Sequence, residues 1–307
     1  MREFSPFEAA AEPFIAGESG RYLAVFKPAG MHSAPIARGD AAASERLPAA
    51  VVGTPPSLLS WLLAQRPGHA AAFADPDLER RAAAECGMLS RLDRETSGLI
   101  LFAKTPEAFE EALSLQAARR IRKSYRLVAA PPSCGAGLPG SRPALCPDLR
   151  LERFFSPAQG AAIDALEVES YFRPFGEGRA SVACLAPEAA GSFRKERSSE
   201  PYTTTFRRLD EPVPDALAGR RGCLVLEAEI CSGFRHQIRA HAAWTGHPIL
   251  GDGRYRGTAA PRLFLEACRI EIAAESGATP GAGAPDGFFA LYGEAPRPAG
   301  TAAPMGR

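Results

Sequence analysis

The sequence has no apolar stretch of the roughly 20 residues that a membrane-spanning helix needs. Its first 20 residues also lack a basic start followed by an apolar run, the pattern typical of a secretory leader. These two absences predict a protein that stays in the cytoplasm. A chain of 307 residues is long enough for one large domain or two smaller ones, each with a buried core.

The sequence also lacks the cysteine and histidine spacings of metal sites and disulfide frameworks. Its seven cysteines are an odd set without a single C-x-x-C pair, which fits reduced thiols in a cytosolic protein. His236 and His241 lie five positions apart, whereas an H-E-x-x-H helix places its histidines four apart. We therefore expect neither a structural metal nor a metal cofactor.

Net charge is small, because 36 basic residues oppose 35 acidic ones and leave +1. Only four of the basic residues are lysines, so 36 − 4 = 32 are arginines, a bias that GC-rich coding explains. Coding bias does not explain the cluster formed by Arg119, Arg120, Arg122, Lys123 and Arg126. Such a cluster is either a solvated face or a strip that binds phosphates.

Apolar and β-branched runs between Pro and Gly signals predict many strands and few helices. The expected helices are 58–66, 77–85, 106–118 and 235–244, and the expected strands are 22–27, 98–103, 123–129, 165–172, 179–185, 202–209, 223–230 and 263–272. Many strands among few helices favour an α+β fold with a mostly antiparallel central sheet flanked by helices and loops.

Two segments combine charged side chains with tight turns. In the first, SRLDRETSG at 90–98, Asp93 stands in a polar loop at the edge of the sheet, where catalytic groups are commonly held. An ordinary loop aspartate would instead cap a turn and pair with Arg91 or Arg94. In the second, SGFRHQIRAH at 232–241, Arg235 and Arg239 share one helix face, which could also be a plain solvated surface.

Both segments resemble motifs of RluA-type pseudouridine synthases. RLDRETSGLILFAKT at 91–105 is similar to their H-R-L-D-x-x-T-S-G-L-L-x-x-A-K motif, and GFRHQIRAHAAWTGHPILGDGRY at 233–255 to their G-R-x-H-Q-I-R motif and its continuation. YLAVFKPAGMHS, KSY and RLFLEACRIEI resemble three shorter motifs of the family, in the same order. The resemblance extends from about residue 20 to residue 272.

This resemblance implies a pseudouridine synthase fold with the active-site cleft across the sheet, and conversion of a uridine in ribosomal RNA or tRNA to pseudouridine. The reaction breaks the bond from N1 to C1′, turns the base and rejoins it through C5, with no cofactor. By similarity Asp93 is the catalytic aspartate, which attacks the ribose or the base or assists cleavage. Arg239 would keep that carboxylate ionised and oriented. Tyr125 would stack on the uracil and help to move the C5 proton, although a strand tyrosine could simply belong to the core.

The resemblance also implies residues that hold the RNA while the uridine is flipped out of the stack. Arg91 is similar to the family residue that fills the gap left by the flipped nucleotide. The other expected RNA contacts, from the motifs and from the basic cluster, are Thr96, Arg235, His236, Gln237, Arg119, Arg120 and Arg122. Lys27 matches a segment at the edge of the sheet and is expected to position a turn.

Three positions depart from the family motifs: Ser90 and Glu266 each replace a histidine, and Phe234 replaces the first arginine of G-R-x-H. These changes affect substrate contacts more than the reaction. We expect an extension at 1–20, one catalytic domain at 21–293 with loop insertions near 34–56 and 131–160, and a disordered tail at 294–307. Fewer than 25 residues precede the first matching strand, so no N-terminal S4 RNA-binding domain is expected.

Two other functions compete with an RNA pseudouridine synthase. One is an RNA-binding protein that keeps the fold without catalysis, which would have no need of Asp93 facing phosphates. The other is a hydrolase that uses Asp93 and Glu95 as paired carboxylates, although their separation in a loop is undefined. The expected partner is RNA alone, bound by a monomer without an obligate protein partner.

Overall fold

The computed structural model describes residues 7, 12–35, 57–75, 85–130, 154, 165–273 and 288–291. Ten strands in this part form one sheet. They are β1 (Phe14–Glu18), β2 (Tyr22–Lys27), β3 (Ser97–Ala103), β4 (Ile121–Ala129), β5 (Ala165–Phe175), β6 (Ser181–Leu185), β7 (Tyr202–Arg208), β8 (Leu224–Ile230), β9 (Leu265–Ile272) and β10 (Phe288–Ala290).

Strand order in the sheet is β1-β2-β3-β9-β4-β8-β7-β5-β6, and β10 also pairs with β9. The pairing of β3 with β9 is parallel, and the other strand pairs are antiparallel. The predicted α+β fold with a mostly antiparallel central sheet is therefore confirmed. Strand β9, from late in the chain, lies between β3 and β4 and pairs with both. It therefore places the segment 91–105, which contains β3, one strand away from β4.

Four helices accompany the sheet in the described part: α2 (Leu58–Gln65), α3 (Pro67–Ala71), α5 (Pro106–Ala117) and α7 (Gln237–Trp244). Ser57 and Thr105 cap α2 and α5, because each side chain accepts a hydrogen bond from a backbone N–H three residues later. Pro67 does not simply end the helical region, since it opens α3, whose first position tolerates a missing N–H. The 3₁₀ turns are η3 (Glu177–Arg179), η4 (Pro187–Phe193), η5 (Asp215–Leu217) and η6 (Gly253–Tyr255).

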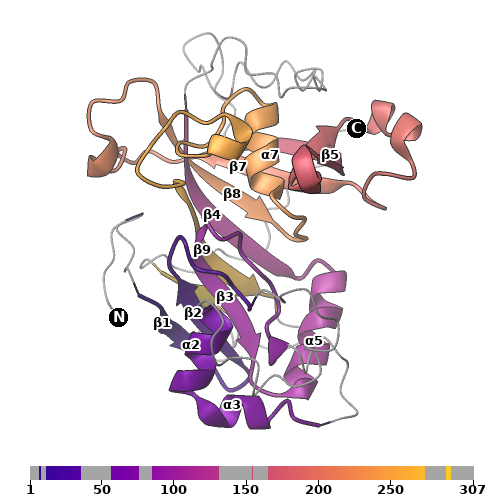
Figure 1. Cartoon of the computed structure of the whole chain (residues 1–307), viewed down its shortest axis with the longest axis vertical. Coiled ribbons are helices and arrows are strands. Elements are labelled where there is room, and N and C mark those ends of the chain that lie inside the picture. Colours follow the sequence, from indigo (N-terminus) through magenta and orange to yellow (C-terminus); the bar gives the residue numbers. More distant parts are fainter. Residues whose placement is uncertain are drawn as a thin grey trace.

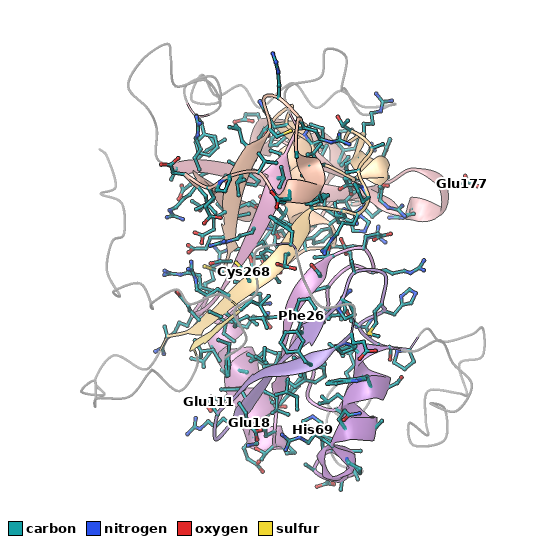
Figure 2. The ribbon with its side chains drawn as sticks, turned by 90° about the vertical axis from the view of Figure 1, so that its left-hand side faces the viewer. Glu18, Phe26, His69, Glu111, Glu177 and Cys268 are labelled. Carbon is teal, nitrogen blue, oxygen red and sulfur yellow. The ribbon has the colours of Figure 1, made fainter. Side chains whose placement is uncertain are left out.

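The long strands β4 and β9 connect two ends of the molecule, each with its own hydrophobic cluster (Figure 1). One end holds β1, β2 and β3 with α2, α3 and α5, and the other holds β5, β7 and β8 with α7. Figure 2 shows Phe26 within the first end and Cys268 on β9 between the two. Between the two ends, strands β3, β9 and β4 lie side by side although β9 is far from the other two in the sequence.

Several expected features lie wholly or almost wholly outside the described residues: the insertions near 34–56 and 131–160, the helix at 77–85 and the tail at 294–307. Within the expected extension at 1–20, the residues of β1 pair with β2 and so form an edge strand of the sheet. No helix in the described part is long and apolar enough to cross a membrane.

Candidate active site

Arg239 on α7 is the centre of a buried group of charges. Its Nε and Nη2 donate to the two carboxylate oxygens of Asp252, both at 2.8 Å, in a bidentate pair. Its Nη1 donates to Oδ2 of Asp93 at 3.0 Å and to Oε2 of Glu95 at 3.4 Å. The side chain of Asp252 is 0% exposed and that of Asp93 is 21% exposed. Arg239 therefore anchors itself on Asp252 and presents its remaining nitrogen to the more accessible Asp93.

The loop that carries Asp93 is held by the turn that follows β2. Lys27 donates from Nζ to the carbonyl oxygens of Pro28, Met31 and Arg94, at 3.0, 2.9 and 3.2 Å. The Gly30 N–H donates to the same Arg94 carbonyl at 2.7 Å. These contacts give Lys27 the turn-positioning role expected from the sequence, and that turn directly supports the backbone next to Asp93.

Ser33 completes this support from the other side of Asp93. Its hydroxyl donates to the Leu92 carbonyl at 2.8 Å and accepts from the Leu92 N–H at 3.0 Å. The Asp93 carbonyl in turn accepts from the Thr96 N–H at 3.2 Å, which closes the loop as a turn. Hydrogen bonds thus fix the backbone on both sides of Asp93.

Lys27 is fully buried, and burial lowers its pKa to about 7, against the opposing charges of Asp93 and Glu95. Between that value and the ordinary 10.5 the unfolded chain binds more protons than the folded one. The free energy of unfolding should therefore rise with pH across this interval, by up to about 1.4 kcal/mol per pH unit from this group. Urea unfolding of Lys27→Met at pH 7, 8 and 9 should show a shallower rise than the wild type. Parallel curves for the two proteins would contradict this prediction.

His236 precedes α7 and lies near Oδ1 of Asp93, whereas Arg239 contacts Oδ2. Its backbone is left-handed, with φ of 56°, so the helix begins at Gln237 rather than at Arg235 as predicted. Tyr255 accepts at its hydroxyl from the Val182 N–H at 2.9 Å, and that hydroxyl lies 3.0 Å from Nδ1 of His236. If the Tyr255 hydroxyl donates its proton to Nδ1, neutral His236 carries its own proton on Nε2. Nε2 lies 3.7 Å from Oδ1 of Asp93. Burial lowers the pKa of His236, which favours this neutral form.

Tyr125 lies on β4 at a bulge in its pairing with β9. Its direct neighbours across the sheet are two small residues, Ala228 on β8 and Ala267 on β9. Burial, with the nearby charge of Asp93, raises the pKa of Tyr125 well above its usual range. The phenol is therefore protonated at neutral pH.

These side chains line one pocket. Asp93, Thr96, Tyr125, His236 and Arg239 all border it, with apolar residues from β8 and β9. Thr96 is 2% exposed, and its hydroxyl has no hydrogen-bond partner among the described residues. A buried hydroxyl without a partner costs free energy, so Thr96 is suited to a polar ligand that enters the pocket. The described residues hold no group of three or more His, Cys, Asp or Glu placed to bind a metal ion.

Gln237 and Arg91 also border the pocket, but both are engaged elsewhere. The Gln237 amide donates to the Thr203 carbonyl and the Thr204 hydroxyl and accepts from the Phe234 N–H. The exposed Arg91 side chain pairs with Glu85. Gln237 is thus held within the protein, whereas the guanidinium of Arg91 is exposed at the surface.

None of the basic residues of the cluster, Arg119, Arg120, Arg122, Lys123 and Arg126, is among the residues that line the pocket. Arg119 pairs with Glu200 at 3.7 Å, and Arg122 with Glu229 at 3.8 Å. Arg120 donates to the Ala273 carbonyl at 3.1 Å. These three arginines therefore belong to the surface around the far end of β4, and they do not join Asp93.

Asp252 and Tyr255, at the end of the segment 233–255, were not expected in the site from the sequence. The turn that contains them is tightly packed, because a Cβ on Gly251 would lie 1.7 Å from the Arg262 carbonyl oxygen, and Gly251 has φ of +79°. The turn delivers Asp252 to Arg239 and Tyr255 to His236. The sequence did contain one indication of Asp252, namely Arg239, because an arginine on a buried helix face needs a carboxylate partner.

The sequence of this chain was also compared with protein families and with known proteins. The family model described as "RNA pseudouridylate synthase" matches residues 21–244. An uncharacterized RNA pseudouridine synthase of Chloroflexus aurantiacus is 28% identical over 182 residues, 59% of this chain and 42% of that protein. The tRNA pseudouridine synthase C of Salmonella typhi is 25% identical over 195 residues, 59% of this chain and 60% of that protein. The chain thus spans less than two thirds of the length of these relatives.

A solved human structure shares the fold. It is titled RNA Pseudouridylate Synthase Domain Containing 1, and it superposes with a TM-score of 0.52 over 86% of this chain and 80% of its own. At 17% identity this likeness concerns the arrangement of the strands and helices alone.

Proposed function

The chain belongs to the RNA pseudouridylate synthase family, and from this premise we propose that it converts a specific uridine of ribosomal RNA or tRNA to pseudouridine with Asp93 as its catalytic residue. One observation carries the proposal. Asp93, paired with Arg239, lines the same pocket as the ring of Tyr125 and the unpartnered hydroxyl of Thr96. That is a carboxylate, a stacking surface and a polar contact around the space that one base would enter.

The reaction is an isomerisation with a simple balance of atoms. The bond from N1 to C1′ breaks, a bond from C5 to C1′ forms, C5 loses a proton and N1 gains one. Asp93 attacks C1′ or the base, or it assists cleavage, and each of these roles requires an ionised carboxylate. Because the side chain of Asp93 is only 21% exposed and Tyr125 is 8% exposed, the uridine must be flipped out of any stack or duplex to reach them.

The surrounding residues take supporting roles in this proposal. Arg239 positions Asp93, and neutral His236 offers Nε2–H beside the other carboxylate oxygen. Thr96 contacts the uracil, the exposed Arg91 fills the gap left by the flipped nucleotide, and Arg235 contacts the RNA backbone. Gln237 acts on the substrate only indirectly, by fixing the backbone of Phe234. Because the Tyr125 phenol stays protonated, it can act only as a relay: as it accepts the proton from C5 it gives up its own, and the net result is the transfer of one proton from C5 to N1.

The test of the function is a map of pseudouridines in cellular RNA with and without this gene. We expect one or a few positions in ribosomal RNA or tRNA to lose pseudouridine when the gene is removed. The purified chain should then restore pseudouridine at the same positions in unmodified transcripts, without added cofactor. Identical maps from the two strains, together with no conversion of the transcripts, would contradict the proposal.

Substitutions of Tyr125 should separate stacking from proton transfer. Tyr125→Phe keeps the ring, so RNA affinity should hold while product formation slows. Tyr125→Leu loses the ring and should weaken both, since stacking of a base is worth about 1 to 3 kcal/mol. The measurements are RNA affinity and tritium release from [5-³H]uridine-labelled RNA, with thermal unfolding to confirm that both variants fold. Equal rates for wild type and Tyr125→Phe would remove the hydroxyl from the mechanism.

The phosphate-binding role of Arg119, Arg120 and Arg122 stays a prediction. Arg119 pairs with the exposed Glu200, and a phosphate can replace such a surface ion pair at little cost. If the three arginines contact phosphates, the triple alanine variant should lower the slope of log affinity against log salt by about one unit for each lost contact. An unchanged slope would assign the cluster to an ordinary solvated face.

The proposal includes a cytoplasmic monomer whose partner is RNA. Cysteines without disulfide spacing fit a reducing compartment. Neither a metal nor an organic cofactor is needed for an isomerisation that a single carboxylate can carry.

A further inference from the structure

A second hollow adjoins the candidate pocket. Its lining residues are Pro174, Gly178, Arg179, Val182, Phe234 and Arg235. Phe234 borders both spaces, so its ring stands between the place proposed for the uracil and the second hollow. Neither the family match nor the proposed reaction assigns this hollow a role.

The Phe234 ring is a rigid platform. It stacks on Phe172 with the ring centroids 5.0 Å apart and the planes 9° apart. Tyr202 supports it at a tilt, with the centroids 5.1 Å apart. Phe172 is completely buried, and the Phe234 N–H is fixed on Gln237 at 2.9 Å. A flat aromatic face held in this way loses little conformational entropy when a base stacks on it.

Cationic groups lie beside this platform. Nη2 of Arg235 donates to the carbonyl oxygens of Arg179 and Ser181, which holds the guanidinium at the rim. Arg179 is exposed and pairs with no carboxylate in the part of the chain that the structure describes. Glu177, from the same turn, lies at its outer tip (Figure 2). An aromatic face with arginines next to it is the combination that binds the base and the phosphate of a nucleotide.

We propose that this hollow is a subsite for the nucleotide next to the target uridine, with its base stacked on Phe234 and its phosphate bound by Arg179 and Arg235. The inference rests on the proposed function. Flipping the uridine also disturbs the stacking of its neighbours, and Phe234 offers a stacking face to one of them directly beside the pocket, while Arg91 fills the gap left by the uridine. The motif that this segment resembles has an arginine at position 234, so the ring gives this chain its own preference at the neighbouring base.

The test uses the RNA segment that the wild type converts, synthesised with an abasic ribose at the position either 5′ or 3′ to the target. At one of these positions the missing base should lower kcat/KM of the wild type by about 5- to 100-fold. Phe234→Leu should show a similar loss on the intact RNA and little further loss on that abasic RNA. The matched control is Phe14→Leu, at the other end of the molecule. Phe14 is also half-buried, and its ring stacks on that of Phe26 with the centroids 4.9 Å apart. This control should respond to the abasic RNAs as the wild type does.

The possible results distinguish a failure of the proposed subsite from a failure of the proposed function. If the abasic positions lower kcat/KM of the wild type and of Phe234→Leu by the same factor, or do not affect the wild type, the subsite is wrong while the function stands. If the wild type converts no RNA, the proposed function itself fails.

The phosphate part of the subsite has its own measurement. Arg179→Gln should lower the slope of log affinity against log salt by about one unit. Arg21→Gln is the control, because Arg21 is an exposed arginine paired with Glu111 far from the hollow. An unchanged slope for Arg179→Gln would remove Arg179 from the subsite.

Discussion

Asp93→Asn is expected to abolish pseudouridine formation, with a loss on the order of a thousandfold or more, while the protein folds and binds RNA as before. Asparagine has almost the same shape, and its side-chain oxygen can still accept from Arg239. The buried charge of Arg239 also keeps its bidentate partner Asp252. What the substitution removes is the negative charge and the nucleophilic oxygen. Tritium release from [5-³H]uridine-labelled RNA measures the loss directly.

Two further variants sharpen this prediction. Asp93→Glu keeps the charge but moves the reactive oxygen by about 1 Å, which can cost on the order of a hundredfold. Glu95→Gln is the matched control, because Glu95 contacts the same nitrogen of Arg239 and its side chain is 48% exposed. This control should keep most of the activity, whereas a hydrolase with paired carboxylates would need both residues. Near wild-type tritium release from Asp93→Asn would show that Asp93 only closes a turn.

The contact between Asp93 and Arg239 could be predicted from sequence because each residue lies in a specific motif. They are 146 residues apart, and local propensities contain no information about such a pair. What the motifs could not show is how the contact is built. Strand β9 lies between β3 and β4, so the pairing that brings the two motifs together depends on long-range packing rather than on local pattern.

The role of Asp252, in contrast, could not be predicted from the sequence. A turn aspartate that caps a 3₁₀ segment and one that neutralises a buried arginine look the same in a sequence, and Asp252 does both. The aromatic stack at Phe234 was equally hidden, because its partners Phe172 and Tyr202 come from two other strands. The basic cluster shows a further limit. Charge spacing along the chain located its arginines but not Glu200 and Glu229, the carboxylates that pair with Arg119 and Arg122.

Arg239→Met should be the second most damaging substitution, and for two separable reasons. Burial lowers the pKa of the Arg239 guanidinium, but the hydrogen bonds and charges of Asp252 and Asp93 raise it further than burial lowers it. Removing the arginine leaves Asp252 as a buried charge without a partner, which costs about 3 to 5 kcal/mol of stability. It also leaves Asp93 without the group that fixes its position.

A double variant distinguishes positioning from stability. Asp252→Asn added to Arg239→Met removes the stranded charge, yet it keeps an oxygen for the Tyr255 N–H that Asp252 accepts at 3.2 Å. Much of the lost free energy of unfolding should return, because a neutral substitute for a buried ion pair is often tolerated. Turnover should stay at least about a hundredfold below wild type, since Asp93 still lacks its partner.

The matched control for this pair is Arg269→Met with Glu227→Gln. Arg269 on β9 is as buried as Arg239 and donates to Glu227 on β8 at 2.9 Å. Glu227 adjoins Ala228, the cross-strand neighbour of Tyr125, so consecutive side chains place this ion pair on the other face of the sheet. Arg269→Met alone should destabilise the fold as Arg239→Met does, and both control variants should keep kcat when assayed below their unfolding temperatures. Recovery of kcat in the Arg239→Met, Asp252→Asn protein would mean that Arg239 only stabilises the fold, because a positioning role predicts a stable protein with a misplaced Asp93.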